Sequence, residues 1–130
     1  MLLATGLLLP ALSGCGPGAY QVFNATAADG GKIAVPAETF ARGPLVVVRP
    51  KGSYYSIALR KKEDNTYSAL LLKCTHQDNQ LTAASDGFSC SLHGSAFNRD
   101  GQVTKGPAER ALTAYRVTIE TNSIIIHTKA

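Results

Sequence analysis

Apolar and polar residues alternate along most of this chain in short runs, and a period of two is typical of half-buried β-strands. The clearest runs are bounded by residue types that favour turns, and they cover 44–49, 54–59, 67–73, 111–119 and 124–127. No stretch repeats apolar residues at positions i, i+3, i+4 and i+7 over three turns. The pattern therefore predicts about six to nine short strands in an all-β sandwich or barrel.

The chain opens on an apolar run, MLLATGLLLPAL, that carries no charge. It is shorter than the roughly 20 apolar residues that span a bilayer, and it has the length of the apolar part of a secretory signal. The next residues, Leu12-Ser13-Gly14-Cys15, resemble the lipobox of bacterial lipoproteins, which are cut before the cysteine and acylated on it. Signals usually open with Lys or Arg, whereas the first cation here is Lys32, so a plain secretory signal and a structural segment remain alternatives.

Residues 16–31 are small and mostly polar, with frequent Gly and Ala. This composition predicts a flexible tether, whose latter part forms a first strand or turn. We therefore expect a signal peptide over 1–15 with a lipid on Cys15, a tether over 16–31, and one domain over 32–130. A single domain fits the length of 130 residues.

The composition, with 45% hydrophobic and 17% charged residues, is that of a folded domain rather than a disordered chain. The formal net charge is +4, but the cations are scattered, with one short run at 60–62. Nucleic-acid binding needs a basic stripe, usually with aromatic residues between the cations. We therefore expect no nucleic-acid partner.

Two short motifs each combine one cysteine with one histidine. Cys74-Thr75-His76 ends a predicted strand, and Cys90-Ser91-Leu92-His93-Gly94-Ser95 follows one. Residues 77–89 between them contain turn signals and are long enough for a hairpin-like excursion. The two loop tips are therefore expected to face each other across a metal site.

The spacing C-x-H followed by C-x-x-H-G-S resembles the Rieske iron–sulfur family, over about residues 32–130. The resemblance implies a Rieske-type 2Fe–2S cluster in an antiparallel β-sandwich with an inserted cluster-binding subdomain of two ligand loops. It assigns Cys74 and Cys90 to the inner iron, and His76 and His93 to the outer, solvent-facing iron. Neutral imidazole ligands raise the reduction potential above that of clusters held by four cysteines.

The resemblance extends beyond the ligands. Ser95 stands where the family uses a hydroxyl to donate a hydrogen bond to a cluster sulfur. The segment Gly106-Pro107-Ala108 resembles the third loop, which covers the cluster and excludes water.

Four positions depart from the Rieske proteins of cytochrome bc complexes. Asn79 and Leu92 replace two cysteines that form a disulfide there, so we expect no such brace. Phe97 replaces a tyrosine whose hydroxyl donates a hydrogen bond to a sulfur there. With the Ser95 bond retained and this one lost, we expect a reduction potential between the high-potential and the ferredoxin-like classes. Gln77 replaces an apolar residue of the quinol-oxidising members, which weakens the case for a quinone-docking surface.

Two other readings of the same residues stay open. Two Cys and two His residues suit a structural zinc ion, although zinc fingers usually place both cysteines in one knuckle. A disulfide between Cys74 and Cys90 would suit an oxidising compartment, but it leaves both histidines unexplained.

The sequence favours a monomeric electron carrier rather than an enzyme acting alone. Its partners would be a redox donor and an acceptor of unknown identity, with a lipid at Cys15 holding the domain in the bacterial cell envelope, facing the periplasm or the exterior. The alternative is a Rieske subunit of a larger oxidoreductase complex. An oxygenase component needs a second, catalytic domain, and only residues 94–130 follow the last ligand.

Overall fold

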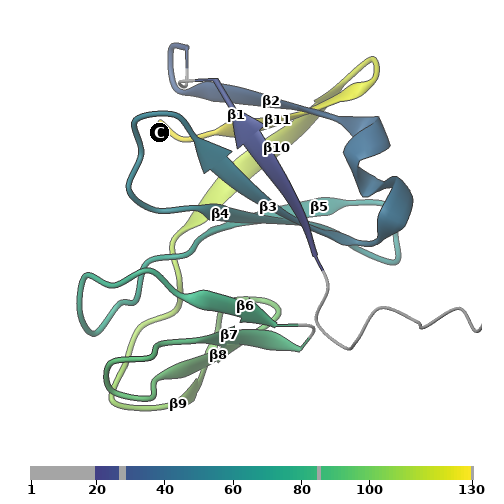
Figure 1. The fold of residues 1–130 in the computed structure, drawn as a ribbon. Helices are drawn as coiled ribbons and strands as arrows, with labels where there is room; N and C mark the ends of the chain where they lie inside the picture. The colour runs from purple at the N-terminus through teal and green to yellow at the C-terminus, as the bar shows by residue number, and fades with distance from the viewer. Residues whose placement is uncertain (1–19, 27–28, 85, 130) are drawn as a thin grey trace, which may run out of the picture.

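The computed structural model describes residues 20–26, 29–84 and 86–129, so the predictions for the signal peptide and Cys15 lie outside the described residues. Figure 1 shows two sheets, a larger one above a smaller one. The larger sheet contains, in spatial order, β1 (Gln21–Ala25), β3 (Leu45–Pro50), β4 (Ile57–Lys61), β5 (Tyr67–Leu71), β10 (Ala114–Glu120), β11 (Ser123–His127) and β2 (Lys32–Pro36). The smaller sheet contains β6 (Thr82–Ala84), β7 (Gly87–Ser89), β8 (Ala96–Asn98) and β9 (Val103–Lys105), and a 3-10 helix, η1 (Ala37–Arg42), follows β2.

The predicted all-β sandwich with an inserted subdomain is confirmed, and every strand pair is antiparallel except β1 with β3. The predicted strand count of six to nine is wrong, because the described residues form eleven strands. The four strands of the small sheet have three residues each, too few for a period of two to be visible. In the predicted tether, residues 21–25 form β1 and therefore belong to the folded domain.

The strands β3, β4 and β5 are buried on both faces, which explains why β3 is an almost unbroken apolar run. One face packs against β2 and β11 and contributes Val46, Val48, Ile57, Leu59 and Ala69. The opposite face contributes Leu45, Val47, Ala58 and Leu70 to a second cluster, shared with the small sheet and its loops. This second cluster holds the small sheet against the larger one.

The small sheet is an antiparallel meander whose strands approach closely at Gly87. A Cβ atom on Gly87 would collide with the carbonyl oxygen of Phe97 on β8. The phenyl ring of Phe97 is only 2% exposed and lies in the cluster shared by the two sheets. Glycine is therefore required for β7 and β8 to pair as they do.

In the described part of the chain, no helix has both the length and the apolar character needed to cross a membrane.

Candidate metal centre

Three loops carry the predicted site residues, and they emerge from the small sheet and its connections to the larger one. Residues 72–81 join β5 to β6, residues 90–95 join β7 to β8, and residues 106–113 join β9 to β10. All three reach toward the lower left of Figure 1. The topology thus brings together segments that are far apart in the sequence.

Each ligand loop is closed by backbone hydrogen bonds beside its cysteine. The amide of Cys74 donates to the carbonyl of Asn79 over 2.9 Å, and the amide of Cys90 donates to the carbonyl of Ser95 over 2.8 Å. Gly94 turns the second loop with a φ of 78°, in the left-handed region that glycine adopts without strain. These bonds give both loops a defined conformation.

The two cysteines form a buried pair. Cys74 and Cys90 are 2% and 3% exposed, both are free thiols, and both lie in the apolar cluster between the sheets. Burial acts to raise the pKa of the Cys90 thiol. Hydrogen bonds from the Asn79 side chain, from the amides of Leu92 and His93, and from Cys74 outweigh this effect and lower the pKa. These hydrogen bonds stabilise the thiolate relative to the thiol, and the thiolate is the form that binds metal.

The two histidines form a second pair at the surface. His76 and His93 are exposed, and their ring centroids lie 5.4 Å apart with an angle of 84° between the planes. Each imidazole follows its cysteine at the tip of a different loop. The four predicted ligands thus lie as an inner thiol pair and an outer imidazole pair.

This donor set suits a centre with two irons, because each iron of a Rieske cluster takes two protein ligands, cysteines on one and histidines on the other. Two buried thiols and two exposed imidazoles are this donor set, so the residues present fit a 2Fe–2S group.

Ser95 and the third loop meet behind the site. Ser95 is fully buried, and its Oγ accepts a hydrogen bond from the amide of Ala108 over 3.0 Å. Ala108 is buried, whereas Gly106 and Pro107 are exposed. A hydroxyl that accepts one hydrogen bond still carries a proton to donate elsewhere.

The third loop is also tied to the first. The Thr75 hydroxyl donates to the carbonyl of Arg110 over 2.6 Å, and the Arg110 guanidinium donates to the carbonyl of Thr75 over 3.3 Å. These bonds hold the segment after Gly106-Pro107-Ala108 against the loop that carries Cys74 and His76.

One functional contact was not predicted from the sequence. Asn79, interpreted there only as the loss of a cysteine, directs its side-chain amide across to the second loop and donates to Sγ of Cys90 over 3.4 Å. The local sequence gives no signal for this contact, because Asn79 and Cys90 lie on different loops that only the folded chain brings together. Leu92, which stands at the other position where the cytochrome bc proteins have a cysteine, is 57% exposed.

Curated proteins of known function are similar to this chain in sequence. The cytochrome b6-f complex iron-sulfur subunit 1 of Nostoc sp. is 31% identical over 78 residues, which cover 58% of this chain and 44% of that protein. The corresponding cyanelle subunit of Cyanophora paradoxa is 29% identical over 123 residues, which cover 91% of this chain and 51% of that protein. The chain thus spans about half the length of these curated relatives.

Solved structures share the fold. The cyanobacterial plasma membrane Rieske protein PetC3 from Synechocystis PCC 6803 superposes with a TM-score of 0.52 at 27% identity, covering 78% of this chain and 88% of that one. Naphthalene 1,2-dioxygenase reaches a TM-score of 0.60 at 20% identity, covering 75% of this chain and 26% of that one, and shows the fold alone.

The family model of the Rieske [2Fe-2S] domain matches residues 31–116, a span that contains all three loops. The chain therefore belongs to the Rieske [2Fe-2S] domain family, and its cofactor is a 2Fe–2S cluster.

Proposed function

We propose that this chain is a one-electron carrier in which Cys74 and Cys90 hold the inner iron and His76 and His93 hold the outer one. The observation that carries the proposal is the division of the four side chains into a buried thiol pair and an exposed imidazole pair. When bound, the 2Fe–2S cluster supplies a site that gains and loses a single electron.

Other residues around the site exclude water, expose the histidines to a partner and donate a hydrogen bond. The apolar cluster around both cysteines excludes water from the inner side of the site. The exposed edges of His76 and His93 offer a partner the closest approach from solvent. Ser95, in this account, accepts from the third loop and directs its own proton toward a cluster sulfur.

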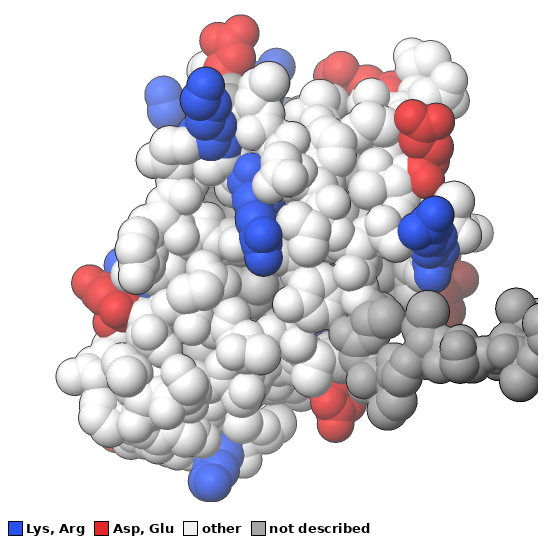
Figure 2. Space-filling view, in the orientation of Figure 1, with Lys and Arg blue, Asp and Glu red and all other residues white. Residues whose placement is uncertain are grey.

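The surface around the loop tips carries a few charged side chains, while most of the lower left of the molecule in Figure 2 is uncharged. Lys105 Nζ lies near Gly94, and the Arg110 guanidinium donates to the carbonyl of Thr75. One ion pair lies on the first ligand loop, where Lys73 Nζ is 3.2 Å from a carboxylate oxygen of Asp78. Exposed Leu92 adds an apolar contact beside His93.

The test is a potentiometric titration of the full chain, purified anaerobically. We expect two irons and two labile sulfides per chain and a titration with the slope of a one-electron couple. The Cys74→Ser variant should lose iron and sulfide together. The matched control is His127→Gln, because His127 is a half-buried histidine on β11, outside the site. Binding of one zinc without sulfide would contradict the proposal.

We further propose that the domain is exported and tethered to a membrane of the cell envelope through a lipid on Cys15, facing the periplasm or the exterior. The lipobox-like sequence at 12–15 supports this, and so does the description of the similar protein PetC3 as a plasma membrane protein. Tyr20 packs against the apolar cluster between the sheets and β1 begins at Gln21. A tether over residues 16–19 would therefore reach at most about 14 Å when fully extended. The domain would then work close to the membrane surface.

Export and acylation are tested by expressing the full chain in a bacterial host with a clickable palmitate analogue. We expect label and membrane association in the wild type and neither in Cys15→Ser. A wild-type chain that is released as soluble, unlabelled protein would contradict the tether.

A second candidate is a Rieske subunit of a larger oxidoreductase. It is favoured by the similarity to two proteins described as cytochrome b6-f complex subunits. Gentle solubilisation followed by native electrophoresis decides between the two. A band at the mass of the chain alone favours the independent carrier, and a stable larger band favours the subunit.

A further inference from the structure

Asn79 lies at the meeting point of the two ligand loops and contacts both cysteines. Its backbone carbonyl accepts a hydrogen bond from the amide of Cys74 over 2.9 Å. Its side-chain Nδ2 donates to Sγ of Cys90 over 3.4 Å, across to a residue eleven positions further along the chain. The contact joins the two ligand loops directly beside both cysteines.

The orientation of the Asn79 amide follows from the chemistry of its partner. A thiolate sulfur accepts hydrogen bonds and repels a carbonyl oxygen, so the NH2 group rather than the oxygen must face Cys90. The amide is neutral and remains a donor across the physiological pH range.

The Asn79 bond is the one that a substitution can remove selectively. The other donors at Cys90 include the backbone amides of Leu92 and His93, which belong to the same loop as the cysteine and survive any side-chain change. The Asn79 side chain comes from the opposite loop. Its backbone bond to Cys74 is retained whatever residue occupies position 79.

We propose that Asn79 is a positioning residue that fastens the two ligand loops together and raises the reduction potential of the cluster through its bond to Cys90. This inference rests on the proposed function, since it needs Cys90 to be an iron ligand. An added electron increases the negative charge on the ligand sulfurs. A donor to a sulfur therefore stabilises the reduced form more than the oxidised form.

Two substitutions separate the loss of the donor from a change of size. Asn79→Leu removes the hydrogen bond with an apolar side chain of similar length, and Asn79→Asp keeps the shape while replacing the donor by a carboxylate. The matched controls are Asn122→Leu and Asn122→Asp. Asn122 is exposed in the turn between β10 and β11, and its backbone carbonyl, which accepts from the amide of Ala37, is retained in both.

The measurement is a potentiometric titration of each full-length variant, followed by electron paramagnetic resonance. For Asn79→Leu we expect the reduced-to-oxidised ratio at a fixed potential to fall about threefold to tenfold, a tenfold change being about 59 mV for a one-electron couple. For Asn79→Asp the reduced-to-oxidised ratio should fall further, because the negative charge of the aspartate opposes reduction of the cluster. The Asn122 variants should stay within about twofold of the wild type. Loaded Asn79 variants that titrate like the wild type would overturn the inference.

A measurement on the unchanged protein covers the case in which the variants do not take up a cluster. In the reduced wild type labelled with 15N-asparagine, pulsed resonance should detect a weak 15N coupling through the N–H···S contact, and its absence would overturn the inference. Iron and sulfide analysis of the wild type comes first. Failure there refutes the proposed function itself, whereas a normal cluster with no coupling refutes the role of Asn79 alone.

Discussion

Replacing Ser95 by alanine removes a single oxygen atom that serves two purposes in this account. The first is visible in the structure, where the buried Oγ accepts a hydrogen bond from the Ala108 amide over 3.0 Å. The second is proposed, namely donation of the hydroxyl proton to a cluster sulfur. Stability reports on the first and the reduction potential reports on the second.

The structural effect follows from burial. Ala108 is 4% exposed, so its amide loses a partner in a place that water reaches poorly. An unsatisfied buried donor costs about 1–3 kcal/mol. For a domain of this size that corresponds to a fall in melting temperature of roughly 3–15 °C.

The effect of Ser95→Ala on the reduction potential is smaller in free energy than its effect on stability, and it is measured separately. A net hydrogen bond is worth about 0.5–1.5 kcal/mol, and about 1.4 kcal/mol corresponds to about 59 mV for a one-electron couple. If the bond forms mainly with the reduced cluster, the potential should fall by roughly 20–60 mV.

The assay combines thermal unfolding by circular dichroism with a potentiometric titration, at matched cluster content. The control is Ser91→Ala, an exposed serine in the same ligand loop. An unchanged melting temperature would refute the importance of the bond to Ala108. An unchanged potential would refute the proposed donation to the cluster, whatever the stability shows.

Two further predictions concern the scaffold. Leu72 is 1% exposed and lies in the cluster between the sheets. Replacing it by alanine should lower the free energy of unfolding, measured by urea denaturation, by about 2–5 kcal/mol. The same change at Ile119, which is 61% exposed, should cost under about 1 kcal/mol, and equal losses would contradict the assigned core. On β11, desolvation lowers the pKa of His127, whose Nε2 lies 2.7 Å from the Thr118 hydroxyl. Folding thus favours the neutral form of His127. The stability that this residue contributes is fully present above the unfolded-state pKa of about 6.5 and is lost as the pH falls below it. His127→Gln should therefore flatten the loss of unfolding free energy between about pH 7 and pH 5, and a slope equal to that of the wild type would contradict this.

The ligand loops could be predicted from the sequence because the metal-binding residue types stand in two short motifs. Two Cys–His pairs at C-x-H and C-x-x-H spacing place four donors on two loops, and the structure brings them together as an inner and an outer pair. Ser95 is buried and accepts a hydrogen bond from Ala108. Its bond to the cluster and the covering role of Gly106-Pro107-Ala108 stay predictions.

Other features depend on contacts between distant segments and left no local signal. Asn79 was predicted only as a missing cysteine, since nothing in the sequence shows that its amide reaches Cys90. Tyr54 was placed on a strand by its apolar run, yet it is 81% exposed before β4 begins at Ile57. A run of apolar residues cannot tell a strand from the loop that leads into it.

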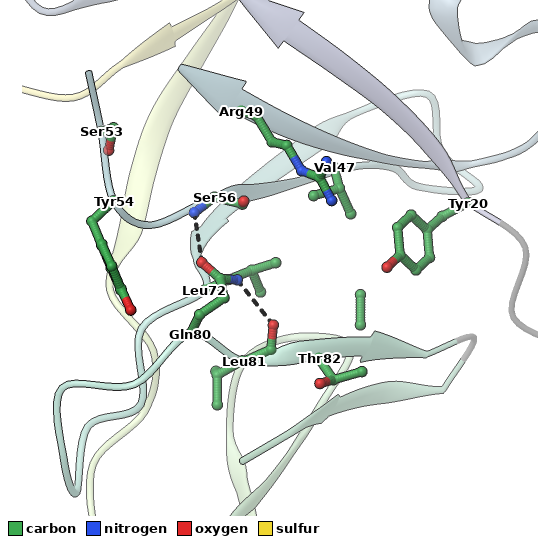
Figure 3. Close-up of a pocket in the computed structure, with 11 residues that line it drawn as sticks. Tyr20, Val47, Arg49, Ser53, Tyr54, Ser56, Leu72, Gln80, Leu81 and Thr82 are labelled. Carbon is green, nitrogen blue, oxygen red and sulfur yellow. Dashed lines mark hydrogen bonds between the residues drawn. The ribbon is translucent and has the colours of Figure 1, made fainter. Parts of the chain in front are cut away.

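The pocket beside Tyr54 is another feature that the sequence does not predict. A pocket of about 330 Å³ is lined by residues of the larger and the smaller sheet, among them Tyr54, Arg49 and Tyr20. Figure 3 shows the residues that line it. Gln80 crosses its floor, accepting from the amide of Ser56 and donating to the carbonyl of Leu81. The bond from Ser56 joins the base of the first ligand loop to the segment before β4, a contact that only the folded chain creates.

The 2Fe–2S centre with two cysteine and two histidine ligands is best tested by electron paramagnetic resonance of the full chain, after anaerobic purification and reduction with dithionite. Mixed ligation by two cysteines and two histidines predicts a rhombic signal with an average g value below that of clusters held by four cysteines, together with two strongly coupled 14N nuclei. A reduced protein that contains zinc, and neither iron nor labile sulfide, would show that the four side chains form a structural site and that this chain carries no electron.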